Sequence, residues 1–262
     1  MAYEHLSLVK EEHIATVTFN RPEKANALNF AHLAEIEDVA LSFRDDADTR
    51  VVIFAGAGKH FCSGADLTDP GHEYAGPMVL RRRKNRIGER AIAALLGIDQ
   101  VTIAAWQGAA MGGGACITTA CDFRIGTDNC FMQYPEIDIG VNLQWKSLPL
   151  ITHLAGPARA KRLVAGGERV HAPTLLDWGI LDQLVDLDQL SQAATEMANL
   201  YVGKPPMAVQ MIKRSVNMIV GALDQSIMHM DYEQHMLASS TEDRNEAVSA
   251  YMNKSSPTFT GN

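Results

Sequence analysis

Hydrophobic and polar positions alternate at the start of the chain and then follow a helical period. Apolar or β-branched residues at Leu6, at Leu8 and from Ile14 to Phe19 lie on either side of a charged segment. This alternation predicts a β-hairpin. From Phe30 to Phe43 the apolar residues recur every three or four positions, which predicts a helix.

Two short apolar runs further along are continuous rather than alternating. They cover Val51–Ala55 and Thr102–Trp106 and are typical of strands buried on both faces. A helical pattern runs between them, roughly from Val79 to Leu96. Strands that alternate with helices predict the α/β class with a largely parallel sheet.

After about Leu187 the pattern becomes almost entirely helical, over Leu190–Tyr201, Met207–Val220 and Ser226–Tyr251. Methionines recur in these segments, and we interpret them as adaptable packing between helices. We therefore expect a core of residues 1–188 and a C-terminal helical region of residues 189–262, which packs against the core or against other subunits.

The charge of the chain limits its partners. The formal net charge of −8 argues against nucleic acid, because phosphate binding needs concentrated Lys and Arg. One exception is the basic segment Arg81–Arg86. Two interpretations of it stay open, a solvated helix face and a site for an anionic ligand such as the phosphates of a coenzyme.

Cysteine spacing and the apolar runs exclude further classes. Cys62, Cys116, Cys121 and Cys130 have no CxxC spacing, and the histidines form no HxxxH pattern, so we expect neither disulfides nor a metal site. The run Val101–Cys121 is long enough to span a membrane, but its glycines suit a buried strand, loop and helix better. We expect a cytoplasmic protein without a membrane segment.

Glycine-bearing loops follow both predicted buried strands, at Phe61–Leu67 and at Gly108–Ala115. Glycine lets the backbone approach a ligand closely, and a helix N-terminus presents unpaired N–H groups. Taken singly, either loop is no more than a tight turn. Two such loops together could direct two N–H groups at one developing negative oxygen.

These loops, in their order and spacing with other segments, resemble the crotonase (enoyl-CoA hydratase/isomerase) superfamily over nearly the whole chain. The segments that carry the resemblance are Asn20–Asn29, Phe61–Leu67, Ile103–Gly108, Met111–Gly114, Cys121–Ile125, Pro135–Gly140, Gly167–Val170 with Ala172, Trp178–Asp182, Lys204–Pro206 and Lys254–Gly261.

The resemblance implies a spiral of ββα units with a C-terminal helical region that forms homotrimers or dimers of trimers. It implies an acyl-coenzyme A substrate, as in fatty acid metabolism, with coenzyme A as part of that substrate and no separate cofactor. The backbone N–H groups of Ala65 and Gly113 would hold the thioester oxygen, and Glu136 would be the acid/base. The residues implied in substrate binding are Lys24, Ala25, Ala27, Leu28, Ser63, Gly64, Asp66, Leu67 and Cys116.

Cys116 is where this chain departs from the hydratases of the family, which resemble one another in having a glutamate at that position as well. A thiol with an ordinary pKa of about 8.5 is mostly neutral at pH 7 and polarises water poorly. A 1,3-proton shift needs only one base, and apolar neighbours would raise the pKa of Glu136 toward that task. Ala115–Ile117 and Trp145–Lys146 also look closer to the Δ3,Δ2-enoyl-CoA isomerases, so isomerisation is the favoured reaction.

Other functions stay open on the sequence alone. Hydratases and hydratase-lyases with one glutamate are alternatives, and so is a member that binds acyl-CoA without turning it over. A plain α/β binding protein unrelated to the family is a further alternative. Tyr134, beside Glu136, could supply a hydroxyl, although a core tyrosine is the simpler interpretation.

Overall fold

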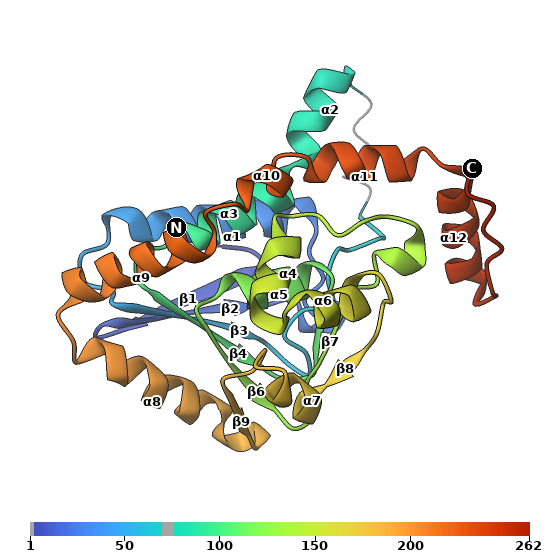
Figure 1. Cartoon of the computed structure of the whole chain (residues 1–262). Helices are drawn as coiled ribbons and strands as arrows, with labels where there is room; N and C mark the ends of the chain where they lie inside the picture. Colours follow the sequence, from blue (N-terminus) through green and yellow to red (C-terminus); the bar gives the residue numbers. More distant parts are fainter. Residues whose placement is uncertain (1–2, 70–75) are drawn as a thin grey trace.

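A six-stranded sheet forms the centre of the molecule in the computed structural model, which describes residues 3–69 and 76–262 (Figure 1). Its strands, in spatial order, are β1 (Leu6–Glu11), β2 (Ile14–Phe19), β3 (Val51–Gly56), β4 (Val101–Trp106), β6 (Phe123–Thr127) and β9 (Gln183–Val185). The first two strands pair antiparallel as a hairpin, and every later pair is parallel. The predicted hairpin, buried strands and α/β class are therefore confirmed.

A smaller sheet lies beside the ends of the central strands. It consists of β5 (Ala109–Met111), β7 (Phe131–Gln133) and β8 (Val170–His171). β5 directly follows β4, β7 follows β6, and Cys62, just after β3, forms a bridge to Ala110 of β5. Successive turns of the chain thus repeat a long strand, a short strand and a helix, so the loops that follow β3 and β5 lie side by side.

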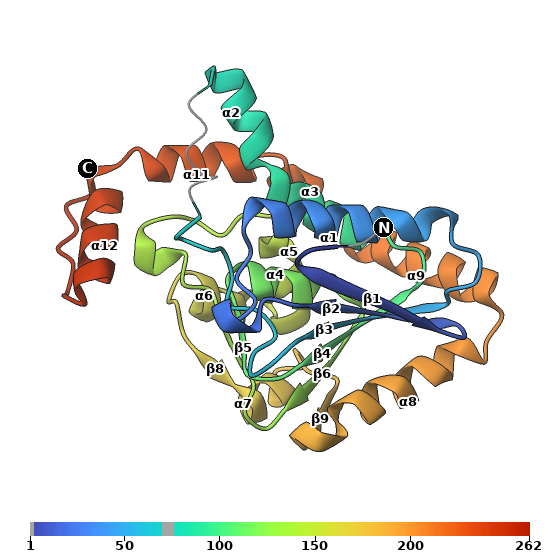
Figure 2. The same ribbon diagram turned by 180° about the vertical axis from the view of Figure 1, so that it is seen from behind.

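Helices cover both faces of the large sheet (Figures 1 and 2). One face packs against α1 (Phe30–Ser42), α3 (Ile87–Leu96), α4 (Gly113–Ala120) and α5 (Ser147–Ala155), and the other against α8 (Leu190–Val202) and α9 (Pro206–Val220). The alternation along β3 shows this division: Val52 and Phe54 belong to the first core, whereas Val51 and Ile53 pack on α8.

The helical stretch predicted from Val79 to Leu96 is two helices rather than one. α2 (Met78–Asn85) ends before Arg86, whose φ of −81° and ψ of 12° interrupt the helix, and α3 begins at Ile87. α2 has no buried residue, so no packing holds it in line with α3. It projects from the body of the molecule in both views (Figures 1 and 2).

The C-terminal region is helical as predicted, but the stretch Ser226–Tyr251 is divided. Its parts are α10 (Gln225–Met228), α11 (Asp231–Ser239) and α12 (Glu242–Asn253). Thr241 caps α12 by accepting the N–H of Arg244 at 3.1 Å, which starts a new helix there. The remaining elements are η1 (Pro22–Lys24), η2 (Phe43–Asp45), η4 (Ile137–Ile139), α6 (Pro157–Val164), α7 (Ala172–Asp177) and η5 (Leu187–Gln189).

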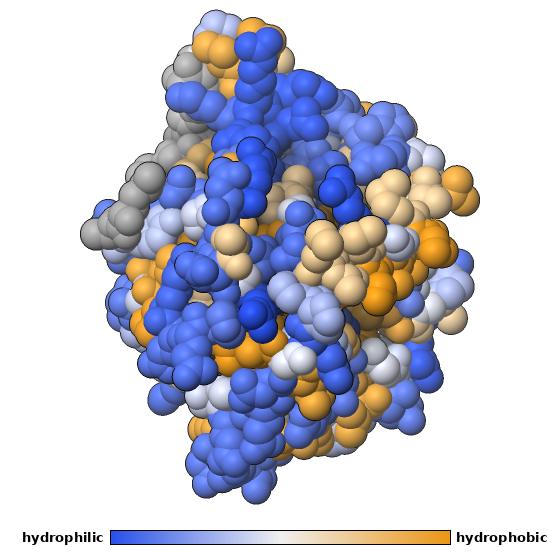
Figure 3. Space-filling model, turned by 90° about the vertical axis from the view of Figure 1, so that its left-hand side faces the viewer, coloured by the Kyte–Doolittle hydropathy of each residue, from blue (hydrophilic) through white to orange (hydrophobic). Residues whose placement is uncertain are grey.

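The methionines of α9 do not pack between helices of this chain, contrary to the sequence interpretation. Met207, Met211 and Met218 are each more than 60% exposed, whereas Met228 of α10 is buried. The exposed hydrophobic side chains of this region belong mostly to α9, and Figure 3 shows hydrophobic groups among polar ones on the side of the molecule where α9 lies. In the described part of the chain, the helices are all too short or too polar to cross a bilayer.

Candidate active site

A parallel β-bridge between Leu28 and Ala65 joins the loop after β3 to the loop that precedes α1. The Leu28 N–H donates to the Gly64 carbonyl at 2.8 Å, and the Asp66 N–H donates to the Leu28 carbonyl at 3.0 Å. A parallel bridge of this kind does not use the N–H of Ala65. That N–H has no acceptor among the described residues, and Ala65 is exposed, so a ligand can reach it.

The start of α4 lies against the same loop. Gly64 has a φ of +91°, and a Cβ on it would stand 2.7 Å from the Met111 carbonyl oxygen and 3.5 Å from the Gly113 nitrogen. Gly113 is the first residue of α4, so its N–H has no partner within the helix. The structure therefore brings together the two backbone segments that the resemblance assigned to the thioester oxygen.

Asn26, which the sequence analysis did not single out, holds the first loop in place. Ala25 and Asn26 are both left-handed, with φ of 50° and 56°. The buried Asn26 amide donates to the carbonyls of Ala57, His60 and Phe61, at 2.9, 2.8 and 3.1 Å. The Ser63 N–H donates to the Ala25 carbonyl at 3.0 Å. An asparagine at a left-handed position is the signal that could have identified this role.

The other predicted substrate-binding residues have mixed surroundings. Ala27 is buried, whereas Lys24 and Leu67 are exposed. Asp66 is buried and accepts the Thr68 hydroxyl at 2.6 Å and an Arg21 N–H at 3.1 Å, and these contacts lower its pKa. Its charge is thus matched by groups of the protein and stabilises the loop.

Glu136 is placed directly beside the start of α4. A Cβ on Gly112 would stand 2.8 Å from its Oε1, so the carboxylate lies directly against the backbone of Gly112. Its Oε2 is inaccessible to solvent and has no hydrogen-bond partner among the described residues. Burial raises the pKa of Glu136 to about 7, and the nearby charge of Asp138 adds to the rise. The pKa of this carboxyl therefore suits proton transfer near neutral pH.

Cys116, one turn into α4, is almost completely buried. Burial, together with the charge of Glu136, raises the pKa of its thiol well above 9, and a hydrogen bond with Ser147 only partly opposes this. The thiol is therefore neutral at physiological pH. A neutral Cys116 leaves Glu136 as the titratable carboxyl beside the α4 N-terminus.

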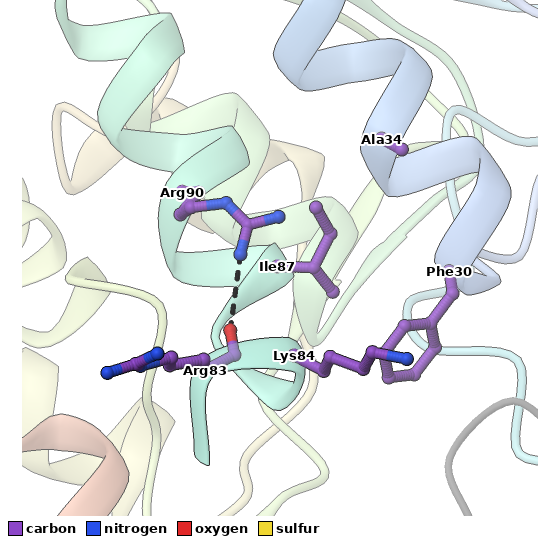
Figure 4. Close-up of a pocket in the computed structure, with 6 residues that line it drawn as sticks. All are labelled: Phe30, Ala34, Arg83, Lys84, Ile87 and Arg90. Atoms are coloured by element: carbon purple, nitrogen blue, oxygen red, sulfur yellow. Dashed lines mark hydrogen bonds between the residues drawn. The ribbon is translucent and has the colours of Figure 1, made fainter. Parts of the chain in front are cut away.

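The side chains of the basic segment Arg81–Arg86 have different surroundings. Arg82 pairs with Glu233, and Arg86 pairs with Glu89 at 2.5 Å. Arg83 and Lys84 border a pocket of about 310 Å³, together with Arg90, which pairs with Glu37 at 3.0 Å (Figure 4). Its lining residues are Phe30, Ala34, Arg83, Lys84, Ile87 and Arg90. Phe30 is two residues beyond Leu28, so this pocket adjoins the loop of the Leu28–Ala65 bridge.

Comparison with known proteins identifies the group to which this site belongs. The sequence profile of the enoyl-CoA hydratase/isomerase family matches residues 9–262. The chain belongs to this family. The resemblance to the crotonase superfamily is thereby confirmed, and members of the family are hydratases or isomerases acting on acyl-CoA thioesters.

Relatives of similar identity carry out different reactions. The short-chain-enoyl-CoA hydratase of Clostridium acetobutylicum is 30% identical over 255 residues, which cover 97% of each chain. The peroxisomal Delta(3,5)-Delta(2,4)-dienoyl-CoA isomerase of Arabidopsis thaliana is also 30% identical, over 98% of each chain. The crystal structure of an enoyl-CoA hydratase from Mycobacterium avium subsp. paratuberculosis matches with a TM-score of 0.87, covering 99% of this chain and 100% of that one. It is 22% identical and shows the shared fold.

Proposed function

We propose that this protein is a Δ3,Δ2-enoyl-CoA isomerase that uses Glu136 as its single base. The observation that carries this proposal is the pairing of a carboxyl whose pKa is about 7 with a neutral, buried Cys116. One base can serve both halves of a 1,3-proton shift, because it takes the proton from one carbon and returns it to another.

In the proposed reaction, Glu136 removes a proton from C2 of a 3-enoyl thioester. The electrons of that C–H bond form a dienolate, whose oxygen accepts hydrogen bonds from the N–H groups of Ala65 and Gly113. These two donors stabilise the negative charge as it develops. Protonated Glu136 then returns the proton at C4, and the double bond moves into conjugation with the carbonyl. The reaction consumes no water and needs no external reductant.

Coenzyme A would lie between the loops of residues 24–28 and 63–67, with its thioester at Ala65. Its phosphates would extend toward the pocket beside α2, into which the Lys84 side chain points, whereas the Arg83 guanidinium points away from it and Arg90 is paired with Glu37 (Figure 4). Coenzyme A enters as part of the substrate, and the proposal needs no separate cofactor and no metal.

A homotrimer, or a dimer of trimers, is the assembly that we propose. The exposed apolar side chains of α9 support it, because so many large apolar side chains exposed on one helix are typical of an interface between subunits. They are Met207, Met211, Ile212, Val216, Met218, Ile219 and Val220, each about half exposed or more. The cytoplasmic location stays a prediction.

Hydration of a 2-enoyl-CoA is the second candidate, and it is favoured by the hydratase among the relatives. It needs a group other than Cys116 to hold the attacking water. The hydratase-lyase reaction has the same requirement. A member that binds acyl-CoA without turning it over is a third candidate, although the raised pKa of Glu136 argues for proton transfer.

The test compares two substrates and one variant. Purified protein is incubated with a 3-enoyl-CoA and separately with a 2-enoyl-CoA, and products are identified by mass and by absorbance of the conjugated thioester. We expect the 3-enoyl substrate to be converted without a change of mass, and Glu136→Gln to lower that rate at least about 100-fold. Addition of one water to the 2-enoyl substrate, without isomerisation of the other, would establish the hydratase instead.

A further inference from the structure

Trp145 fills the space between two helices next to the proposed thioester site. A Cβ on Gly88 of α3 would stand 2.0 Å from its Cε2 atom, and a Cβ on Gly113 of α4 would stand 2.2 Å from its Cζ3 atom. The indole therefore lies directly against both helices, and both positions tolerate only glycine while it is there. The Leu28 side chain borders the same space, because its Cδ1 is 3.0 Å from the Cβ position of Gly113.

This placement departs from local preferences of the chain at two points. Trp145 and Lys146 are consecutive left-handed residues, each with a φ of 60°, which is rare for bulky side chains. Gly88, the second residue of α3, leaves the room that the indole fills. Unfavourable backbone geometry at adjacent residues is found at functional sites.

Contacts from two other elements hold the left-handed turn. The Lys146 N–H donates to Oδ2 of Asp231 on α11 at 2.6 Å, and its Nζ lies 3.3 Å from Glu89 of α3. Glu89 and Asp231 are both buried. The indole is thus fixed from α3, α4 and α11 and is not a mobile surface side chain.

The position of the indole relative to the proposed chemistry defines its effect. In the proposed reaction the thioester oxygen accepts the Gly113 N–H, and C2 lies within reach of Glu136. The rest of the acyl chain then has to pass along the N-terminal turn of α4. Glu136 lies against Gly112 in that turn. The indole lies against the next residue, Gly113, where it closes the gap between α3 and α4. We propose that Trp145 is a specificity-determining residue that restricts the enzyme to short, compact acyl groups. This inference rests on the proposed function.

Binding of saturated acyl-CoA tests the inference without requiring turnover. Dissociation constants for butyryl-CoA and decanoyl-CoA are measured by calorimetry for the wild type, Trp145→Ala and Trp145→Phe. We expect the wild type to bind decanoyl-CoA no more tightly than butyryl-CoA. In Trp145→Ala, decanoyl-CoA should gain at least about tenfold in affinity relative to butyryl-CoA, because each newly buried methylene contributes about fourfold. Trp145→Phe, which keeps a ring, should shift in the same direction by a smaller factor and carries the test if the alanine variant does not fold.

Tryptophan fluorescence provides a readout that a merely structural role would not change. Butyryl-CoA should alter the emission of the wild type and of Trp178→Phe, a control whose buried indole packs on Arg159 and Arg162, but not of Trp145→Phe. An unchanged ratio of the two affinities in both Trp145 variants would overturn the inference while leaving the proposed function intact. Failure of the wild type to bind either acyl-CoA would overturn the proposed function, and this inference with it.

Discussion

Replacing Glu136 with glutamine should stabilise the folded protein at neutral and alkaline pH while removing its activity. Burial raises the pKa of this carboxyl from 4.5 to about 7, so the folded protein keeps a proton that the unfolded chain has released. The free energy of unfolding therefore falls as the pH rises from about 4.5 to about 7 and is level above that. The size of this pKa difference corresponds to about 3 kcal/mol. Glutamine does not titrate, so the free energy of unfolding of the variant does not fall in this way.

The assay is urea unfolding of the wild type and Glu136→Gln at a series of pH values between about 4 and 8. Protein concentration is held constant, since assembly of subunits would shift the apparent stability. The stability of the variant minus that of the wild type should increase with pH by about 3 kcal/mol. The same titration should appear in the wild-type kinetics as a rise of kcat/KM through about pH 7, because the base acts when deprotonated.

Glu196→Gln serves as the matched control, because Glu196 is an exposed carboxylate on α8, across the sheet from α4. Its stability difference from the wild type should stay level over the same pH range. A level difference for Glu136→Gln as well would refute the reasoning, since it would mean that the Glu136 carboxyl titrates as it does in the unfolded chain.

Three further substitutions test the site and the assembly. Gly64→Ala should lower the free energy of unfolding by more than about 1 kcal/mol and reduce turnover, because its Cβ would stand 2.7 Å from a carbonyl oxygen beside the proposed donors. Gly179→Ala, whose φ is also positive but which has nothing within 4 Å, should keep its turnover, and equal losses in the two variants would contradict the clash. Cys116→Ala should keep most of the isomerase rate, since the thiol is neutral; a loss as large as that of Glu136→Gln would speak against the single base. Ile219→Asp should convert the proposed trimer into monomers in sedimentation velocity, whereas Asn217→Asp on the same exposed helix should not, and a monomeric wild type would disprove the proposed interface.

Sequence pattern was sufficient for the parts of the fold in which periodicity and burial agree. The continuous run at Val51–Ala55 became a strand buried on both faces, and the helix from Phe30 has its predicted apolar face. The pattern failed at α2, where it continued a helix through Arg86. Helical periodicity does not show whether the apolar positions have anything to pack against, and α2 has no buried residue.

The site was predictable where it depends on short motifs and not where it depends on contacts between distant segments. The loops at Gly64 and Gly112 and the carboxyl of Glu136 were predicted from the resemblance, and the structure places them side by side. The position of Trp145 could not be found in this way. It depends on glycines at 88 and 113 and on Asp231, which are spread over much of the chain and show no shared pattern.

All four thiols of this chain are free and buried, which has a consequence for its chemistry under oxidising conditions. Burial raises the pKa of Cys62, Cys121 and Cys130 to about 12, and that of Cys116 well above 9. Because the thiolate is the reactive form, the folded protein resists alkylation and disulfide exchange despite its thiol content. Reaction at Cys62, which is next to the loop of Ala65, would require local opening there, so the rate of labelling at Cys62 reports how often this loop separates from its neighbours.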